Sequence, residues 1–238
     1  MPLNGKTVVI LGGSSGIGLA TAKAALAERA AVIITGRSRE RLDNAVRELG
    51  AGARAVALDS SDETGTRAMF NGIERVDHIF VNAGGVTPDA ALKVEVAAMR
   101  PAMDVRLWGA VYAAKFGGSK MGAGGSITFM SGTSAFRPIP GAAVGSASCA
   151  AVEGLARSLA VDLAPIRVNA IRPGLIDTPL IDSFMGERKD AMVEAYSRRI
   201  PVKRMGRADE VADAVLFLMK NEYVNGTTLV IDGGGSLV

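Results

Sequence analysis

The 238-residue chain is poor in the side chains that metal sites and disulfides require. It contains a single cysteine, Cys149, which excludes an internal disulfide and a cysteine-rich zinc site and gives no sign of an oxidising compartment. It also contains a single histidine, His78, which excludes any site built on two histidines. From these absences we expect no metal site.

Long apolar runs and strong net charge are missing as well. No stretch of about 18 consecutive apolar residues is present that would span a membrane. Lys and Arg number 27 against 24 Asp and Glu, a formal net charge of +3, and they form no basic stripe. The first six residues lack the pattern of a secretory signal peptide. We expect a cytoplasmic protein that binds neither membranes nor nucleic acid.

The pattern that is present is an alternation of short apolar runs, rich in Val and Ile, with longer helical stretches. Near-continuous apolar strands are typical of a parallel sheet whose two faces are covered by helices. The expected fold class is therefore α/β, a Rossmann-type doubly wound sheet of seven parallel strands in one domain spanning residues 1–238. The expected strands are residues 7–11, 31–35, 55–58, 78–81, 126–130, 168–171 and 228–231. The expected helices include 20–29, 39–48, 141–163 and 208–219.

A glycine-rich turn joins the first expected strand to the first helix. It reads Gly12-Gly13-Ser14-Ser15-Gly16-Ile17-Gly18. Glycines allow the backbone to turn tightly and to approach a diphosphate, which then lies on the N–H groups at the helix N-terminus. The position of the turn between a strand and a helix is the context that a dinucleotide site requires.

The end of the second strand indicates which dinucleotide is bound. An NAD site places a carboxylate there for the ribose hydroxyls, but this chain has Gly36 followed by Arg37. A carboxylate would repel a 2′-phosphate, whereas an arginine binds one through charge-assisted hydrogen bonds. The alternative is a surface arginine in a strand-to-helix loop. The sequence favours NADP(H) over NAD(H).

Taken over its whole length, the chain resembles the short-chain dehydrogenase/reductase superfamily. Besides the glycine turn, the resemblance rests on Asp59, on Asn82-Ala83-Gly84, on Arg172-Pro173-Gly174 and on the C-terminal run from Asn225 to Gly234. It implies that Asp59 meets the adenine, that Asn82-Ala83-Gly84 supports the ribose, and that Pro173 to Thr178 holds the nicotinamide end. The implied cofactor-binding residues are Gly12, Ser14, Ser15, Gly16, Ile17, Gly18, Arg37, Ser38, Asp59, Ser60, Asn82, Ala83, Gly84, Pro173, Gly174, Ile176 and Thr178.

The same resemblance places a catalytic tetrad of Asn, Ser, Tyr and Lys at four positions that hold other residues here. The run from Ser146 to Leu155 matches the segment that follows the family's tyrosine. The tetrad positions are accordingly Arg106, Gly132, Gly145 and Cys149. No tyrosine of this chain is followed by a lysine four residues later. The catalytic residues therefore remain unknown.

Several residues near these positions have alternative interpretations. Arg106 is expected to fill the space that the family's lysine leaves, to bind an anionic ligand, or simply to pack and reach solvent. Ser131 is adjacent to the serine position, but a neighbour on a strand points to the opposite face. Cys149 is expected to be a buried filler and His78 a surface or edge residue.

Three functions follow as hypotheses. The first is an NADP(H)-dependent oxidoreductase for a carbonyl or alcohol substrate with a non-standard catalytic site. The second is a catalytically silent NADP(H)-binding sensor or inactive subunit. Elimination from a halohydrin ranks last, because relatives of that type keep the Ser and Tyr and lose the glycine loop. The resemblance also implies a substrate lid at about residues 179–200, and a homo-tetramer, a dimer or a hetero-oligomer with an active relative.

Overall fold

The centre of the molecule is a seven-stranded parallel sheet, as the sequence predicts, and its strand order is β3-β2-β1-β4-β5-β6-β9. The computed structural model describes residues 3–84, 93–186 and 189–238. The strands are β1 (Thr7–Leu11), β2 (Ala31–Gly36), β3 (Ala53–Ala57), β4 (His78–Val81), β5 (Ser126–Met130), β6 (Arg167–Pro173) and β9 (Thr228–Ile231). Their registers align the apolar strand centres, for example Val9 opposite both Ile33 and Ile79.

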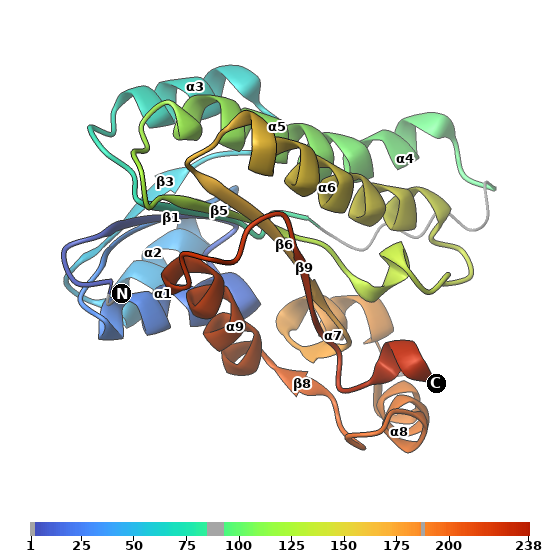
Figure 1. Cartoon of the computed structure of the whole chain (residues 1–238). Helices are drawn as coiled ribbons and strands as arrows, with labels where there is room; N and C mark the ends of the chain where they lie inside the picture. The colour runs from blue at the N-terminus through green and yellow to red at the C-terminus, as the bar shows by residue number, and fades with distance from the viewer. Residues whose placement is uncertain (1–2, 85–92, 187–188) are drawn as a thin grey trace.

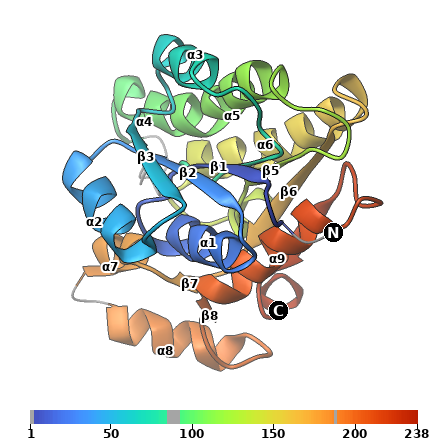
Figure 2. The same cartoon turned by 90° about the vertical axis from the view of Figure 1, so that its left-hand side faces the viewer.

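Helices cover both faces of this sheet (Figures 1 and 2). One face carries α1 (Gly16–Ala27), α2 (Arg39–Leu49) and α9 (Ala208–Lys220). The other carries α3 (Glu63–Asn71), α4 (Val96–Met103), α5 (Gly109–Tyr112) and α6 (Ala143–Asp162). Each face buries its own apolar cluster, centred on residues such as Ile10 and Leu218 on the first and Phe70 and Phe129 on the second. This burial of both faces explains why the strands are continuously apolar.

The strand order reverses between β1 and β4, which are hydrogen-bonded neighbours in the middle of the sheet. In open α/β sheets, ligands bind outside the carboxyl ends of the strands at this point of reversal. Here β1 ends at Leu11 and β4 ends at Val81, so the glycine turn and the Asn82-Ala83-Gly84 segment leave the sheet side by side.

Some elements differ from the sequence prediction. Strand β3 begins two residues earlier than expected, and α1 begins at Gly16 rather than at residue 20. Two short strands, β7 (Ile176–Asp177) and β8 (Gly206–Arg207), form a second parallel pair that periodicity could not predict, because each has two residues. Between α4 and Gly117 the helix widens into two π-helical turns, at Asp104–Trp108 and Ala113–Gly117.

The expectation that His78 lies at the surface or an edge is wrong. His78 opens β4, a central strand, and is 4% exposed. Its register partner on β5 is Ser126, and His78 Nδ1 lies 2.9 Å from Ser126 Oγ. Burial lowers the pKa of His78 to about 4, although the charge of Asp77 opposes the shift.

Acid should therefore destabilise the protein through His78. Because burial lowers the folded-state pKa below the ordinary 6.5, only the unfolded chain takes up this proton as the pH falls from about 6.5 towards 4. Between pH 7.5 and pH 5 this single group should remove about 2 kcal/mol from the free energy of unfolding. Urea titrations of wild type and His78→Asn at both pH values measure it, since other titrating groups are common to both proteins. An identical pH dependence in the two proteins would contradict the expectation.

Candidate functional site

A large cavity opens at the carboxyl edge of the sheet, with a volume of about 1930 Å³. Sixteen of the seventeen predicted cofactor-binding residues line it, and Gly18 is the exception. All four tetrad positions line the same cavity. One half of the cavity is bounded by the glycine turn and the ends of β2 and β3, and the other by residues 131–149 and the segment after β6.

The glycine turn is packed too closely for side chains at two of its glycines. Gly12 has a φ of +85°, and a Cβ there would lie 3.0 Å from the backbone nitrogen of Ala83. At Gly18, which is buried in α1, a Cβ would lie 2.1 Å from the carbonyl oxygen of Gly12. Only glycine permits this approach, which leaves the N–H groups at the start of α1 facing a cavity without side chains in front of them. The turn therefore fits a diphosphate.

A hydrogen bond joins Asn82, the residue after β4, to the glycine turn. Asn82 Nδ2 donates to the Gly12 carbonyl oxygen at 2.8 Å, and the Asn82 backbone N–H donates to Leu11 at 2.9 Å. A Cβ on Gly18 would also lie 2.9 Å from Asn82 Nδ2. Asn82 thus fixes the shape of the glycine turn from the neighbouring strand.

The end of β2 brings a positive charge to the cavity where an NAD site needs a negative one. A Cβ at Gly36 would lie 3.1 Å from Ser14 Oγ, so a carboxylate there would crowd the glycine turn. Arg37 is exposed at the cavity wall, and Ser38 caps α2 by accepting a hydrogen bond from the Arg41 N–H at 3.2 Å. This end of the cavity suits an additional phosphate group.

Asp59 lies at the end of β3 as an ionised carboxylate. Burial alone would raise the pKa of Asp59, but hydrogen bonds from the Ser61 side chain and backbone N–H, with the charge of Arg37, hold that pKa below its usual value. Its neighbour Ser60 is buried beside Gly109, where a Cβ would lie 3.0 Å from the Ser60 carbonyl oxygen. Both residues line the cavity.

In the other half, three of the four tetrad positions carry small residues. Cys149 is 5% exposed, which confirms the prediction of a buried filler. A Cβ at Gly132 would lie 3.5 Å from Cys149 Sγ, an ordinary van der Waals contact. Gly145 lies one helical turn before Cys149 on α6. Hence the positions that the family resemblance assigns to Ser, Tyr and Lys face one space together.

Arg106 is the only charged side chain among the four tetrad positions. It belongs to the π-helical turn Asp104–Trp108, and its Nη1 donates to the Met130 carbonyl oxygen at 3.0 Å. Its guanidinium lies against Gly84, where a Cβ would come within 2.9 Å of Cζ. The side chain therefore reaches the carboxyl ends of both β4 and β5.

Sequence reasoning missed a buried polar network behind this wall. Ser131 Oγ donates to Glu153 Oε1 at 2.6 Å, and Arg172 donates to the same carboxylate from Nε at 2.8 Å and from Nη2 at 2.5 Å. Ser131 is consequently engaged with α6, although it borders the cavity. The spacing of Glu153 and Arg172 along the sequence gives no sign of the pair, because it forms only when β6 packs against α6.

The segment predicted as a lid consists of α7 (Pro179–Met185) and α8 (Lys189–Arg199), and two of its residues, 187–188, lie outside the described residues. Tyr196 Oη accepts a hydrogen bond from the Leu175 N–H at 3.2 Å and borders the cavity. Lys189 pairs with Asp177 at 3.2 Å and Asp182 at 2.5 Å. These contacts attach α8 to the segment that the resemblance assigns to the nicotinamide.

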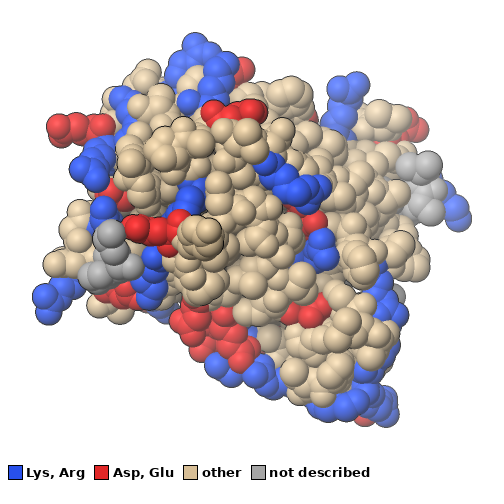
Figure 3. Space-filling model, viewed as in Figure 1, with Lys and Arg blue, Asp and Glu red and all other residues tan. Residues whose placement is uncertain are grey.

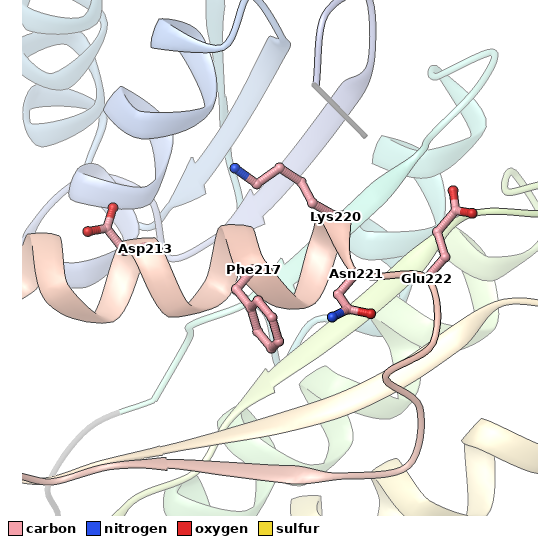
Figure 4. A pocket seen from close by; sticks show the side chains of 5 residues that line it. All are labelled: Asp213, Phe217, Lys220, Asn221 and Glu222. Atoms are coloured by element: carbon pink, nitrogen blue, oxygen red, sulfur yellow. The ribbon is translucent and has the colours of Figure 1, made fainter.

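A second, smaller hollow of about 580 Å³ lies at the C-terminal end of α9 (Figure 4). Its lining consists of Asp213, Phe217, Lys220, Asn221 and Glu222, and none of these is a predicted site residue. Lys220 points away from Phe217 towards α1, where it pairs with Glu28 at 2.5 Å. The cavity at the carboxyl edge is therefore the candidate site.

The described ranges contain neither a metal-binding cluster nor a membrane-spanning helix. No group of three or more His, Cys, Asp or Glu side chains is arranged to hold a metal ion there. Among the same residues, no helix combines the length and apolar character needed to cross a bilayer.

Comparisons with known proteins agree with this geometry. Residues 12–236 match the sequence model of the family described as Enoyl-(Acyl carrier protein) reductase. The short-chain dehydrogenase/reductase ucsE of Acremonium sp is 34% identical, over 98% of this chain and 96% of its own.

Two solved structures are similar along the whole fold. The MalC reductase/Diels-Alderase of Malbranchea aurantiaca is 29% identical with a TM-score of 0.93, covering 99% of this chain and 98% of its own. A small-chain dehydrogenase in complex with NADPH is 36% identical with a TM-score of 0.81, covering 99% of this chain and 100% of its own. The chain belongs to the short-chain dehydrogenase/reductase superfamily of oxidoreductases.

Proposed function

We propose that the protein binds NADP(H) and transfers hydride between it and a carbonyl or alcohol substrate, using a non-standard catalytic site. The observation that carries this proposal is the continuity of one cavity from the Arg37 end, past the glycine turn, to the four tetrad positions. The solved NADPH complex of a relative that is 36% identical adds support. When bound, the cofactor supplies the hydride or accepts it.

The residues of this chain have separate tasks in the proposal. The N–H groups at the start of α1 bind the diphosphate, Arg37 binds the 2′-phosphate, and Asp59 meets the adenine. The segment from Pro173 to Thr178 orients the nicotinamide end. In the half of the cavity that takes the substrate, Arg106 adds a positive charge to the wall.

In the first step of the test, NADPH and NADH are titrated into the purified protein, and binding is monitored by fluorescence. NADPH or NADH is then mixed with a panel of ketones and aldehydes, NADP⁺ or NAD⁺ with the matching alcohols, and the loss or formation of the reduced cofactor is recorded. We expect tight NADPH binding, weak NADH binding and slow turnover. Failure to bind either cofactor would refute the proposal. Binding of NADPH without turnover of any compound in the panel, charged or neutral, would also refute it.

Replacing Arg37 should weaken the binding of NADPH much more than the binding of NADH. Arg37→Ala removes the charge-assisted hydrogen bonds to a 2′-phosphate, so the Kd for NADPH should rise by about 10- to 100-fold. The Kd for NADH should change by less than about threefold, because that cofactor has no such phosphate. Arg39→Ala, two residues later in the same exposed cluster, serves as the matched control for net charge. Equal losses for both cofactors would contradict the role of Arg37.

A second candidate function is a catalytically silent NADP(H)-binding protein, a sensor or an inactive subunit. It is favoured by the residues at positions 132, 145 and 149, which supply neither the proton donor nor the lysine of the family pattern. A positioned acid or base contributes roughly 10²–10⁴-fold to a rate. Confirmed NADPH binding with no consumption over the whole panel favours this candidate over the first.

We also propose that the chain assembles with itself as a tetramer or dimer, or with an active relative. On the face shared by α6, α9, β9 and the C-terminus, Figure 3 shows uncharged areas that are interrupted by several charged groups. This face exposes the apolar side chains of Val161, Phe217, Tyr223, Val230 and Leu237. Exposed apolar surface of this kind favours association. Light scattering of the purified protein measures its mass, and a pull-down that captures no relative argues against the hetero-oligomer.

A further inference from the structure

The carboxylates that line the cavity lie in one of its two halves, together with Arg37 and Arg41. Among the described lining residues, the carboxylates are Glu40, Glu48 and Asp59, and all three lie at the ends of β2 and β3 or on α2. The described lining of the other half contains three arginines, Arg106, Arg137 and Arg199, and no Asp or Glu. The half that faces the substrate in the proposed function is therefore positive.

Carboxylates that lie close to this half are bound elsewhere. Glu153 is paired with Arg172 behind the wall, at 2.5 Å. Asp177 and Asp182 are both paired with Lys189. Asp232 accepts hydrogen bonds from the backbone N–H groups of Gly234 at 2.9 Å and Ser236 at 2.7 Å. In these contacts, the four carboxylates are thus engaged with groups other than Arg137 and Arg199.

Arg137 is held at the rim of the cavity by a neutral group. Its Nη1 donates to the Gly235 carbonyl oxygen at 3.1 Å, and the side chain is half-buried. A carbonyl acceptor orients a guanidinium but leaves its positive charge in place. The remaining N–H groups of a guanidinium form a planar fork that matches a carboxylate or a phosphate.

Arg106 is oriented in a similar way at the carboxyl ends of the strands. Its hydrogen bond to the Met130 carbonyl oxygen and its packing against Gly84 fix the plane of the guanidinium beside the backbone. Since Gly84 has no side chain, the guanidinium lies directly on the segment that follows β4. A preoriented arginine loses less conformational freedom when it binds an anion.

We infer that the substrate half of the cavity takes a small organic anion, a carboxylate or a phosphate ester, whose charged group is bound by Arg106 and Arg137. The inference rests on the proposed function for the identity of that half as the substrate side. Arg199 on α8 adds charge at the mouth of the cavity and attracts anions towards it. Neutral ketones of the same shape should bind weakly.

The experiment measures binding rather than turnover, by calorimetry on protein saturated with NADP⁺. The probes are a panel of aromatic aldehydes that carry a carboxylate, the same aldehydes as methyl esters, and phenyl phosphates that carry an aldehyde. We expect at least one charged probe to bind ten or more times as tightly as its ester. The carboxylate and phosphate arms identify which anion is preferred. Binding should weaken in 0.5 M salt.

Variants assign the effect to the two arginines. Arg106→Gln and Arg137→Gln should each weaken binding of the preferred anion by about tenfold or more and leave ester binding within about threefold. Arg157→Gln, an exposed position on α6 outside the cavity lining, is the control for net charge. NADPH affinity is measured for every variant, so a failure of cofactor binding is recognised separately.

Two results would overturn the inference. One is that no charged probe binds more tightly than its ester, in a protein that binds NADPH normally. The other is that Arg157→Gln weakens anion binding as much as the two cavity variants do. If NADPH does not bind, the proposed function fails, and the same probes applied to the unliganded protein still decide whether Arg106 and Arg137 bind anions.

Discussion

Restoring the superfamily's four side chains is expected to raise NADPH-dependent reduction of neutral ketones by about 10²-fold or more. The variant is Arg106→Asn, Gly132→Ser, Gly145→Tyr and Cys149→Lys. A tyrosine at 145 supplies a proton donor, and a lysine one turn later lowers its pKa. Gly132 has space for a side chain, because in the wild type a Cβ there meets only Cys149 Sγ, at 3.5 Å, and position 149 is itself replaced in the variant. Initial rates of NADPH consumption measure the gain.

The quadruple variant is compared with a triple variant and is tested for folding and for cofactor binding. The triple variant that keeps Gly145 should remain near the wild-type rate, because it lacks the proton donor. Circular dichroism and NADPH titration verify that the quadruple variant folds and binds cofactor. A folded variant that binds NADPH and gains no activity would show that the wild-type rate is not limited by these four positions.

Glu153→Ala should lower the free energy of unfolding by about 3–5 kcal/mol, a large part of the stability of an ordinary domain. The side chains of Arg172 and Glu153 are only 15% and 7% exposed. Arg172 donates hydrogen bonds to Glu153, and these raise the pKa of Arg172. An arginine stays charged even without such a partner, so removing Glu153 leaves a buried charge unpaired by this carboxylate. The variant also takes from Ser131 its carboxylate acceptor. Guanidinium chloride titration measures the loss.

Two companion variants isolate the buried pair. Glu194→Ala removes an exposed pair with Arg198, in which both side chains are more than half exposed, and should cost less than about 1 kcal/mol. The double variant Glu153→Leu and Arg172→Leu should be clearly more stable than Glu153→Ala, since no charge is then left buried. If Glu153→Ala lowers the free energy of unfolding no more than Glu194→Ala does, the buried pair of Glu153 and Arg172 does not stabilise the fold as its burial indicates.

Much of the fold follows from local patterns in the chain. Each central strand is apolar over its whole length, which predicts burial on both faces, and the glycine turn marks the switch from β1 to α1. What the patterns could not predict depends on residues far apart. His78 is a polar residue at the start of a strand, and its sequence position gives no sign of burial. Its ring contacts Ser126, 48 residues away, and this hydrogen bond lowers the free-energy cost of burying it.

In the candidate site, too, residues near strand ends could be predicted, and contacts between distant segments could not. Gly12, Gly16 and Arg37 are neighbours of strand ends, so the parallel order of the strands brings them to one cavity. The environment of Arg106 was left open by the sequence, because Gly84 and Met130 come from different strands. The two-residue strands β7 and β8 carry no periodic signal, although they connect the segment after β6 to the start of α9.

The hydrogen bond from Asn82 to Gly12 has a consequence for how such a protein diverges. It joins residues 12 and 82, whereas Gly132 follows β5, and Gly145 and Cys149 lie on α6. Mutations in the later segment leave the tie between β1 and β4 untouched. A duplicated gene of this fold is therefore free to lose or replace its catalytic residues step by step. Nucleotide binding and the stability that it adds to the folded protein persist under selection.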